Sequence, residues 1–231
     1  MFTNFYTYIF FYILIISCSM GYGLAINSIS KKFKITDNLG YVGLIGVLFL
    51  IIYAYLSSIF IHHGQFHNSI ILIIGLIFFV KFYFFNSKKK KEQWTYFFII
   101  FLILLMGAFF LKTHDDFPYY HFSYSHYLTE NSLIFGMGHF NLGYRTPSSI
   151  FYLNSLFYLP FVKYFMFHMP AILIMGFSNL VLLIKLKKNI ANNQINFITY
   201  FTLLVLIFIN IFFYRISEHG TDKSAMILIF L

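Results

Sequence analysis

Long apolar segments alternate with short polar ones along almost the whole chain of 231 residues. A helix needs about 20 mostly apolar residues to cross a bilayer. Segments that reach or approach this length lie at 5–27, 39–61, 69–85, 94–111, 169–184 and 195–214, and a further apolar run begins at 225. The pattern predicts an all-α integral membrane protein, a single polytopic domain over 1–231 with about six or seven transmembrane helices. Because the sequence stops inside the last run, we expect this domain to be C-terminally incomplete.

The composition agrees with this class. The chain is 60% hydrophobic and only 10% charged, whereas a soluble domain is about 25% charged. The net charge of +9 does not indicate nucleic-acid binding, because membrane proteins gather basic residues in their cytoplasmic loops. The expected partner is the lipid bilayer, and the single cysteine, Cys18, excludes an intrachain disulfide.

The basic residues predict how the helices are oriented. Most of them fall at the ends of alternate apolar segments, at Lys31, Lys32, Lys34, Lys81, Lys88, Lys89, Lys90, Lys91, Lys185, Lys187 and Lys188. If these lysines are cytoplasmic, as the positive-inside rule requires, the N-terminus and the loop 112–168 lie outside. All nine histidines then lie outside as well. The alternative explanation for the outward histidines is that loops poor in lysine look richer in every other polar residue.

A polar cluster follows the fourth apolar segment, at 114–149, and it contains two adjacent aspartates, four histidines and Arg145. Ionisable residues in a membrane protein indicate a functional site by default. In the pair Asp115 and Asp116, the charge of one carboxylate raises the pKa of the other, which suits a general base or a metal ligand. The alternative is structural, because Asp116 stands where an N-cap residue would precede Pro118.

Two short helices and a glycine-rich turn are predicted within and after this cluster. Residues 119–127 form an aromatic helix, and 150–162 is too short to span a bilayer. We expect 150–162 to be an amphipathic helix on the outer surface, with Thr146 as its cap and an end at Pro160. Between the two helices, the glycines of 136–143 can bring backbone N–H groups close to an anion.

Arg145 follows this turn directly, and its planar guanidinium suits a phosphate, although a headgroup anchor is the alternative reading. We interpret Arg215 as a lipid-headgroup anchor, unless Glu218, His219 and Asp222 fold back to the site that contains Arg145.

The arrangement resembles that of the GT-C glycosyltransferases, in which an outward-running membrane helix is followed by an acidic, aromatic outer loop. A finer pattern is similar to a family of uncharacterised bacterial multi-pass proteins near that superfamily. It consists of Asp116-x3-Tyr120-His121, Gly136-x-Gly138-His139-Phe140-Asn141 and Ser148-Ser149-Ile150-Phe151 with Asn154. The resemblance therefore covers 116–154, and it divides the chain into three N-terminal spans (1–93) and a GT-C-like region (94–231) with its outer loop at 112–168.

The resemblance implies a glycosyltransferase of the bacterial cytoplasmic (inner) membrane that uses a polyprenyl-phosphate sugar at the outer face. Asp115 or Asp116 would be the catalytic base. The substrate would be bound by Tyr120, His121, His139, Asn141 and Arg145. The resemblance specifies no cofactor, and a divalent metal ion is a candidate, with His114, Asp116 and His121 as its candidate ligands.

Two other functions remain open from the residues alone. The first is a metal- or haem-handling protein at the outer face, since nine outward histidines and an Asp pair supply suitable ligands. His63 and His67 stand four residues apart. The second is a polysaccharide polymerase or transporter, although ionisable residues avoid the centres of the spans, which argues against an ion-coupled carrier.

Overall fold

The computed structural model describes residues 4–29, 35–86, 90–109, 115–211, 216 and 221–231. This part of the chain is all-α and contains no β-strand. Its nine α-helices are α1 (Phe5–Ile29), α2 (Leu39–Phe60), α3 (Gln65–Asn86), α4 (Lys91–Ala108), α5 (Phe122–Glu130), α6 (Ser149–Leu156), α7 (Met169–Ala191), α8 (Phe197–Ile211) and α9 (Thr221–Ile229).

The predicted class of all-α membrane protein is confirmed. Within the described ranges, five helices are long and apolar enough to cross a membrane, namely α1, α2, α3, α4 and α7. The sixth predicted span, 195–214, contains α8, which is apolar and has 15 described residues, while 212–214 lie outside the described residues. The run beginning at 225 falls within α9, a helix of nine residues. The structure thus supports five spans by length and composition, where six or seven were expected.

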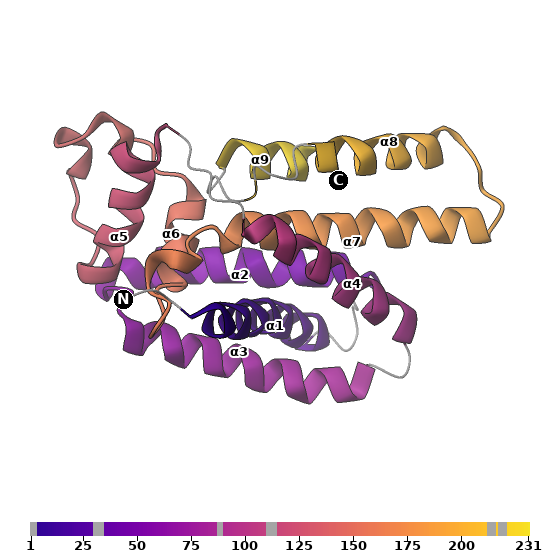
Figure 1. Cartoon of the computed structure of the whole chain (residues 1–231), viewed down its shortest axis with the longest axis horizontal. Helices are drawn as coiled ribbons and strands as arrows, with labels where there is room; N and C mark the ends of the chain where they lie inside the picture. Colours follow the sequence, from indigo (N-terminus) through magenta and orange to yellow (C-terminus); the bar gives the residue numbers. More distant parts are fainter. Residues whose placement is uncertain (1–3, 30–34, 87–89, 110–114, 212–215, 217–220) are drawn as a thin grey trace.

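Helix α1 lies at the centre of the bundle, between α2 and α3 (Figure 1). Glycines make this arrangement possible. A Cβ atom on Gly46 would lie 1.9 Å from the carbonyl oxygen of Ser19, and a Cβ on Gly21 would lie 2.0 Å from that of Gly75. Small residues let membrane helices approach closely enough for backbone-to-backbone packing. The three N-terminal spans therefore form one tight unit.

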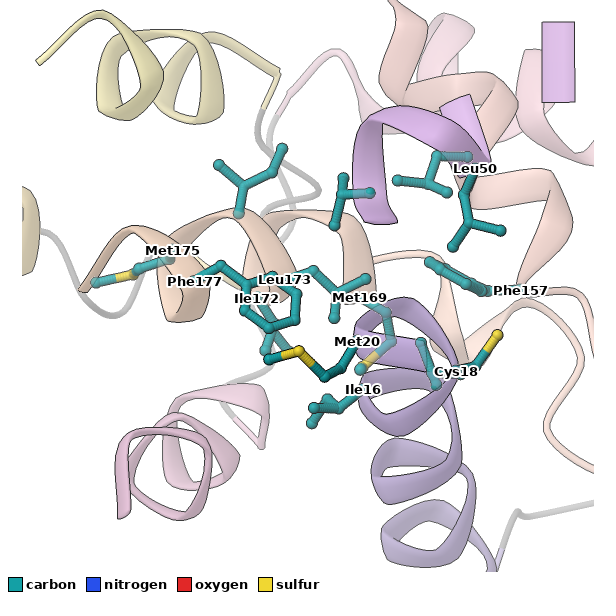
Figure 2. Close-up of a cluster of buried hydrophobic side chains, with 14 of the residues drawn as sticks. Ile16, Cys18, Met20, Leu50, Phe157, Met169, Ile172, Leu173, Met175 and Phe177 are labelled. Carbon is teal, nitrogen blue, oxygen red and sulfur yellow. The ribbon is translucent and has the colours of Figure 1, made fainter. Parts of the chain in front are cut away.

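Helix α7 joins this unit to the rest of the chain, since it packs against α2, α4, α8 and α9. Figure 2 shows its residues Met169, Ile172 and Leu173 beside Met20 of α1, in a cluster that also includes Leu50 of α2. All five of these side chains are buried. The apolar core thus runs continuously from the N-terminal unit into α7, the first span after the polar loop.

Helices α5 and α6 cap one end of the bundle (Figure 1). The amide of His63, which precedes α3, donates to the carbonyl of Leu128 in α5 at 2.8 Å, and the amide of Leu133 donates to Ser58 of α2 at 2.7 Å. At the same end, the hydroxyl of Tyr8 lies 2.5 Å from Nε2 of His168. We call this end, with the start of α1 and the end of α2, the capped end.

Helix α6 corrects the expectation for 150–162. It spans only Ser149–Leu156, and its N-cap is Ser148, whose side chain accepts from the amide of Ile150, rather than Thr146. It does not lie on the surface, because every residue from Ile150 to Leu156 is buried. A helix that is apolar on all sides is stable only when other elements surround it, and here α2, α5 and α7 do so.

At the opposite end, charged side chains form ion pairs with one another. Lys187 of α7 forms an ion pair with Glu92 of α4, and Lys90 forms one with Asp37. The predicted separation of the lysine-rich segments from the histidine-rich ones thus holds along the bundle axis. The capped end as the outer side of the membrane stays a prediction from the positive-inside rule.

Candidate functional site

Asp116 is the N-cap residue of a single π-helical turn, Phe117–His121, that leads into α5. Its carbonyl accepts from the amides of Tyr120 and His121. Its side chain, however, makes no capping hydrogen bond to this turn. Instead, the hydroxyl of Tyr120 donates to Oδ2 of Asp116 at 3.2 Å. The predicted position of Asp116 as N-cap residue before Pro118 is therefore confirmed, but its side chain does not make the capping hydrogen bond.

The two aspartates differ in their surroundings. Asp116 is half-buried, whereas Asp115 is exposed. Since only Asp116 is shielded and held by a tyrosine hydroxyl, its geometry suits a positioned carboxylate better than that of Asp115. His114, a predicted metal ligand, lies outside the described residues.

Tyr120 and His121 line a cavity of about 270 Å³, which we call the Tyr120 cavity. The imidazole of His121 is 5% exposed and lies against the rings of Tyr120 and Phe151, with centroids 4.5 and 4.9 Å away. The remaining lining comes from the start of α6 and from α9, and the full set is Tyr120, His121, Thr146, Ser148, Phe151, Thr221, Asp222 and Ala225. The cavity thus joins three elements that are far apart in the sequence.

Asp222 is the functional candidate that the loop pattern alone did not identify. It lies in the first turn of α9 and lines the Tyr120 cavity. The pKa of Tyr120 is raised by burial and also by the negative charges of Asp116 and Asp222, so Tyr120 stays protonated and able to donate. The one indication in the sequence was the polar segment before the last apolar run, of which Glu218 and His219 lie outside the described residues.

His139 and Arg145 line a second cavity, of about 370 Å³, which we call the Arg145 pocket. Its wall includes the turn from Gly136 to Gly138. Gly136 has a φ of +91°, which favours glycine. Nε of Arg145 donates to the carbonyl of Gly138 at 3.3 Å. The predicted proximity of the glycine turn and the guanidinium is thus present in the structure.

The predicted site residues therefore fall into two neighbouring cavities. Tyr120 and His121 belong to one, and His139 and Arg145 belong to the other. Between them, Asn141 donates to the carbonyl of Tyr119 at 3.1 Å and accepts from the amide of Gly143 at 2.9 Å. A Cβ atom on Gly143 would lie 2.5 Å from the ring of Tyr120, so this turn packs directly on the tyrosine. Asn141 thus ties the turn at Gly143 to the π-helical turn that carries Tyr120.

The residues that are described contain no group of three or more His, Cys, Asp or Glu arranged to hold a metal ion. His63 and His67, which sequence spacing made a candidate pair, are instead stacked with ring centroids 5.3 Å apart. The hydroxyl of Tyr53 lies 2.8 Å from Nε2 of His67. In this part of the chain, both histidines belong to a hydrogen-bond network.

That network reaches α6, the helix whose Phe151 lines the Tyr120 cavity. The hydroxyl of Ser155 in α6 donates to a backbone carbonyl, so its oxygen accepts from Nδ1 of His63 at 2.6 Å, and Nε2 of His63 lies 2.8 Å from the hydroxyl of Ser57. Asn68 donates to the carbonyls of His63, Ser155 and Tyr158 at 2.8–3.0 Å. Burial, and then the neighbouring His67 and His62, lowers the pKa of His63 to about 3. His63 is therefore neutral at physiological pH.

A helical bundle with five candidate spans and two cavities at one end defines a multi-pass membrane protein. Residues 6–231 match the family described as Domain of unknown function (DUF8201), and the chain belongs to this family. Comparison with curated proteins and with solved structures gives no match.

Proposed function

We propose that this protein transfers a sugar from a polyprenyl-phosphate donor to an acceptor at the outer face of the bacterial cytoplasmic membrane. The observation that carries the proposal is the pairing of two unlike cavities at the capped end. One is lined by Tyr120, whose hydroxyl is bonded to Asp116, and the other contains Arg145 and His139. A group transfer needs both features, namely a base for the attacking group and a positive site for the leaving group.

In the proposed reaction, an acceptor hydroxyl attacks the anomeric carbon of the donor sugar. A new C–O bond forms, the bond from that carbon to the phosphate oxygen breaks, and the phosphate leaves with the electron pair. Asp116 takes the proton of the acceptor hydroxyl. Positioned proton transfer of this kind accelerates a reaction by about 10²–10⁴-fold. Tyr120 fixes the orientation of the carboxylate through its hydrogen bond to Oδ2.

The Arg145 pocket would hold the phosphate. A guanidinium offers a planar set of donors that matches phosphate oxygens, and Arg145 is exposed beside the glycine turn. His139 lines the same pocket, and its imidazole supplies a second donor. Asn141 acts indirectly in this scheme, because it keeps Gly143 against the ring of Tyr120.

The test compares Asp116→Asn with Asp115→Asn in a host that makes the glycan and lacks its own copy of the protein. Asp116→Asn removes the base without changing the size of the side chain, so we expect glycan to fall by about 10²-fold or more. Asp115→Asn is the matched control, since the neighbouring carboxylate is exposed, and it should leave glycan near the wild-type amount. Unchanged glycan in the Asp116→Asn strain, at normal protein level, would contradict the proposal.

A further inference from the structure

We propose that the Tyr120 cavity is the acceptor site, that it takes one neutral, polyhydroxylated ring, and that Asp222 binds the hydroxyl groups of that ring. This inference rests on the proposed function and deepens it. It assigns the two reactants to the two cavities, and it adds a binding residue from α9 to those of the outer loop.

The charges of the two linings carry the assignment. The Arg145 pocket includes Arg145 and His139 and no carboxylate among its lining residues. The described lining of the Tyr120 cavity includes Asp222 and neither Lys nor Arg. An anion placed beside a carboxylate is repelled, whereas a neutral polyol is not. The phosphate of the donor therefore fits the Arg145 pocket, and the uncharged reactant fits the Tyr120 cavity.

The shape and chemistry of the Tyr120 cavity suit a sugar ring. Sites for drug-sized ligands are roughly 300–1,000 Å³, so a cavity of about 270 Å³ has room for one ring rather than for an oligosaccharide. The rings of Tyr120 and Phe151 form part of its wall. The hydroxyls of Thr146 and Ser148 supply donors and acceptors, and that of Thr221, which donates to Oδ1 of Asp222 at 3.3 Å, supplies an acceptor.

Asp222 is held in place by the packing of its helix. Ser224 and Ile227 of α9 are buried, and α9 packs against α7. Asp222 itself is exposed at the edge of the cavity, where its two oxygens can accept hydrogen bonds from adjacent hydroxyls of an entering ring. Tyr120, on the same lining, donates its hydroxyl to Asp116. A ring in the cavity therefore contacts Asp222 and the tyrosine that is bonded to the base.

A structural role for Asp222 has to be separated from binding. An acidic residue in the first turn also stabilises a helix by offsetting the partial positive charge there. The experiment must therefore restore a carboxylate chemically at this position and compare it with a neutral group of nearly the same shape. The chain allows this, because its one native cysteine, Cys18, is buried and can be replaced by alanine.

The test uses Asp222→Cys in a Cys18→Ala background, in right-side-out membrane vesicles from the glycan-producing host, with incorporation of radiolabelled sugar as the readout. Iodoacetate adds a carboxymethyl group to the thiol and restores a carboxylate, whereas iodoacetamide adds the neutral amide. We expect Asp222→Cys to lower transfer at least tenfold, iodoacetate to restore more than half of it, and iodoacetamide to restore none. The unmodified Asp222→Cys protein and its two modified forms should unfold at the same temperature in detergent.

A second variant tests the cavity without changing its charge. Ala225→Leu fills the space from an exposed helical position, and we expect it to lower transfer at least tenfold with unchanged thermal unfolding. The inference is overturned if Asp222→Cys transfers like its background, if the two reagents act alike on fully modified protein, or if Ala225→Leu transfers normally. If Asp116→Asn abolishes transfer in any of these cases, the proposed function stands and only the role of the cavity fails. If Asp116→Asn transfers normally, the proposed function itself fails.

Discussion

The two ends of the helix bundle satisfy their polar groups in opposite ways. At the capped end, His63, Asn68 and Ser155 are 0–1% exposed and form a network of neutral hydrogen bonds across α2, α3 and α6. At the opposite end, Lys187 and Glu92 form an ion pair, but their side chains remain 47% and 56% exposed. One end is therefore held by buried neutral groups and the other by charges in contact with water.

This difference has a functional consequence. A buried hydrogen-bond network fixes the position of each member, because any group left without a partner costs about 1–3 kcal/mol. Exposed ion pairs contribute about 0–1 kcal/mol, and their main effect in a membrane protein is on orientation. The two cavities lie at the capped end, where the surrounding side chains are the more firmly positioned.

The largest expected effect comes from Asn68→Ala. This change removes the amide that donates to the carbonyls of His63, Ser155 and Tyr158, so we expect the free energy of unfolding to fall by about 2–4 kcal/mol. The measurement is denaturant unfolding in detergent. Asn189→Ala is the control, because Asn189 donates to Thr199 at a half-buried position, and it should cost less than about 1 kcal/mol. Equal losses would remove the contrast between the ends.

The next effect is a pH dependence that the capped end should show. The pKa of His63 is lowered to about 3 in the folded protein, against about 6.5 in an unfolded chain. Between these values the unfolded state binds the additional proton, so the stability that is present above pH 6.5 is lost as the pH falls. We expect a loss of about 1.4 kcal/mol per pH unit, or about 2 kcal/mol at pH 5.

The control for this pH dependence is His63→Gln, which keeps a polar side chain but removes the titrating imidazole. Its free energy of unfolding should be lower than that of the wild type at pH 7.5 but should change less between pH 7.5 and 5. If the slope is the same in the wild type and in His63→Gln, another group is responsible and the neutral network does not set the pH response.

The smallest effect is expected from Glu92→Gln at the charged end. Because the pair of Glu92 with Lys187 is about half-exposed, its loss should lower the free energy of unfolding by less than about 1 kcal/mol. The effect should shrink further at high salt, since exposed charges are screened. Thermal unfolding in detergent at low and high salt measures both. A loss above 2 kcal/mol that persists in high salt would mean that this end is also held by its polar groups.

Much of the fold followed from hydropathy. The segment predicted at 39–61 is α2 (Leu39–Phe60), because a long apolar run defines a span without reference to its neighbours. The segment at 169–184 was predicted too short, since α7 continues to Ala191 through Lys185, Lys187 and Lys188. Lysine is a good helix former, so the end of the apolar run was not the end of the helix.

The site was predictable only in part, because sequence spacing places neighbouring residues but does not show how distant segments pack. Asp116, Tyr120 and His121 lie within about one helical turn, so their proximity follows from sequence spacing. Their separation from His139 and Arg145 into a second cavity depends on how the turn at Gly143 packs on Tyr120. Helix α6 was expected on the surface and is buried, because the apolar composition of a short helix does not say which elements surround it.

The sequence by itself determined the class of this protein, the approximate positions of its five candidate spans, and the grouping of most lysines away from the histidines, since these depend on the local cost of placing each residue in lipid or in water. Only the tertiary structure decided which polar residues meet. Asp222 reaches the Tyr120 cavity because α9 packs on α7, and His63 becomes a buried neutral group because α6 closes over it. Both results depend on contacts between distant segments, which leave no pattern along the chain.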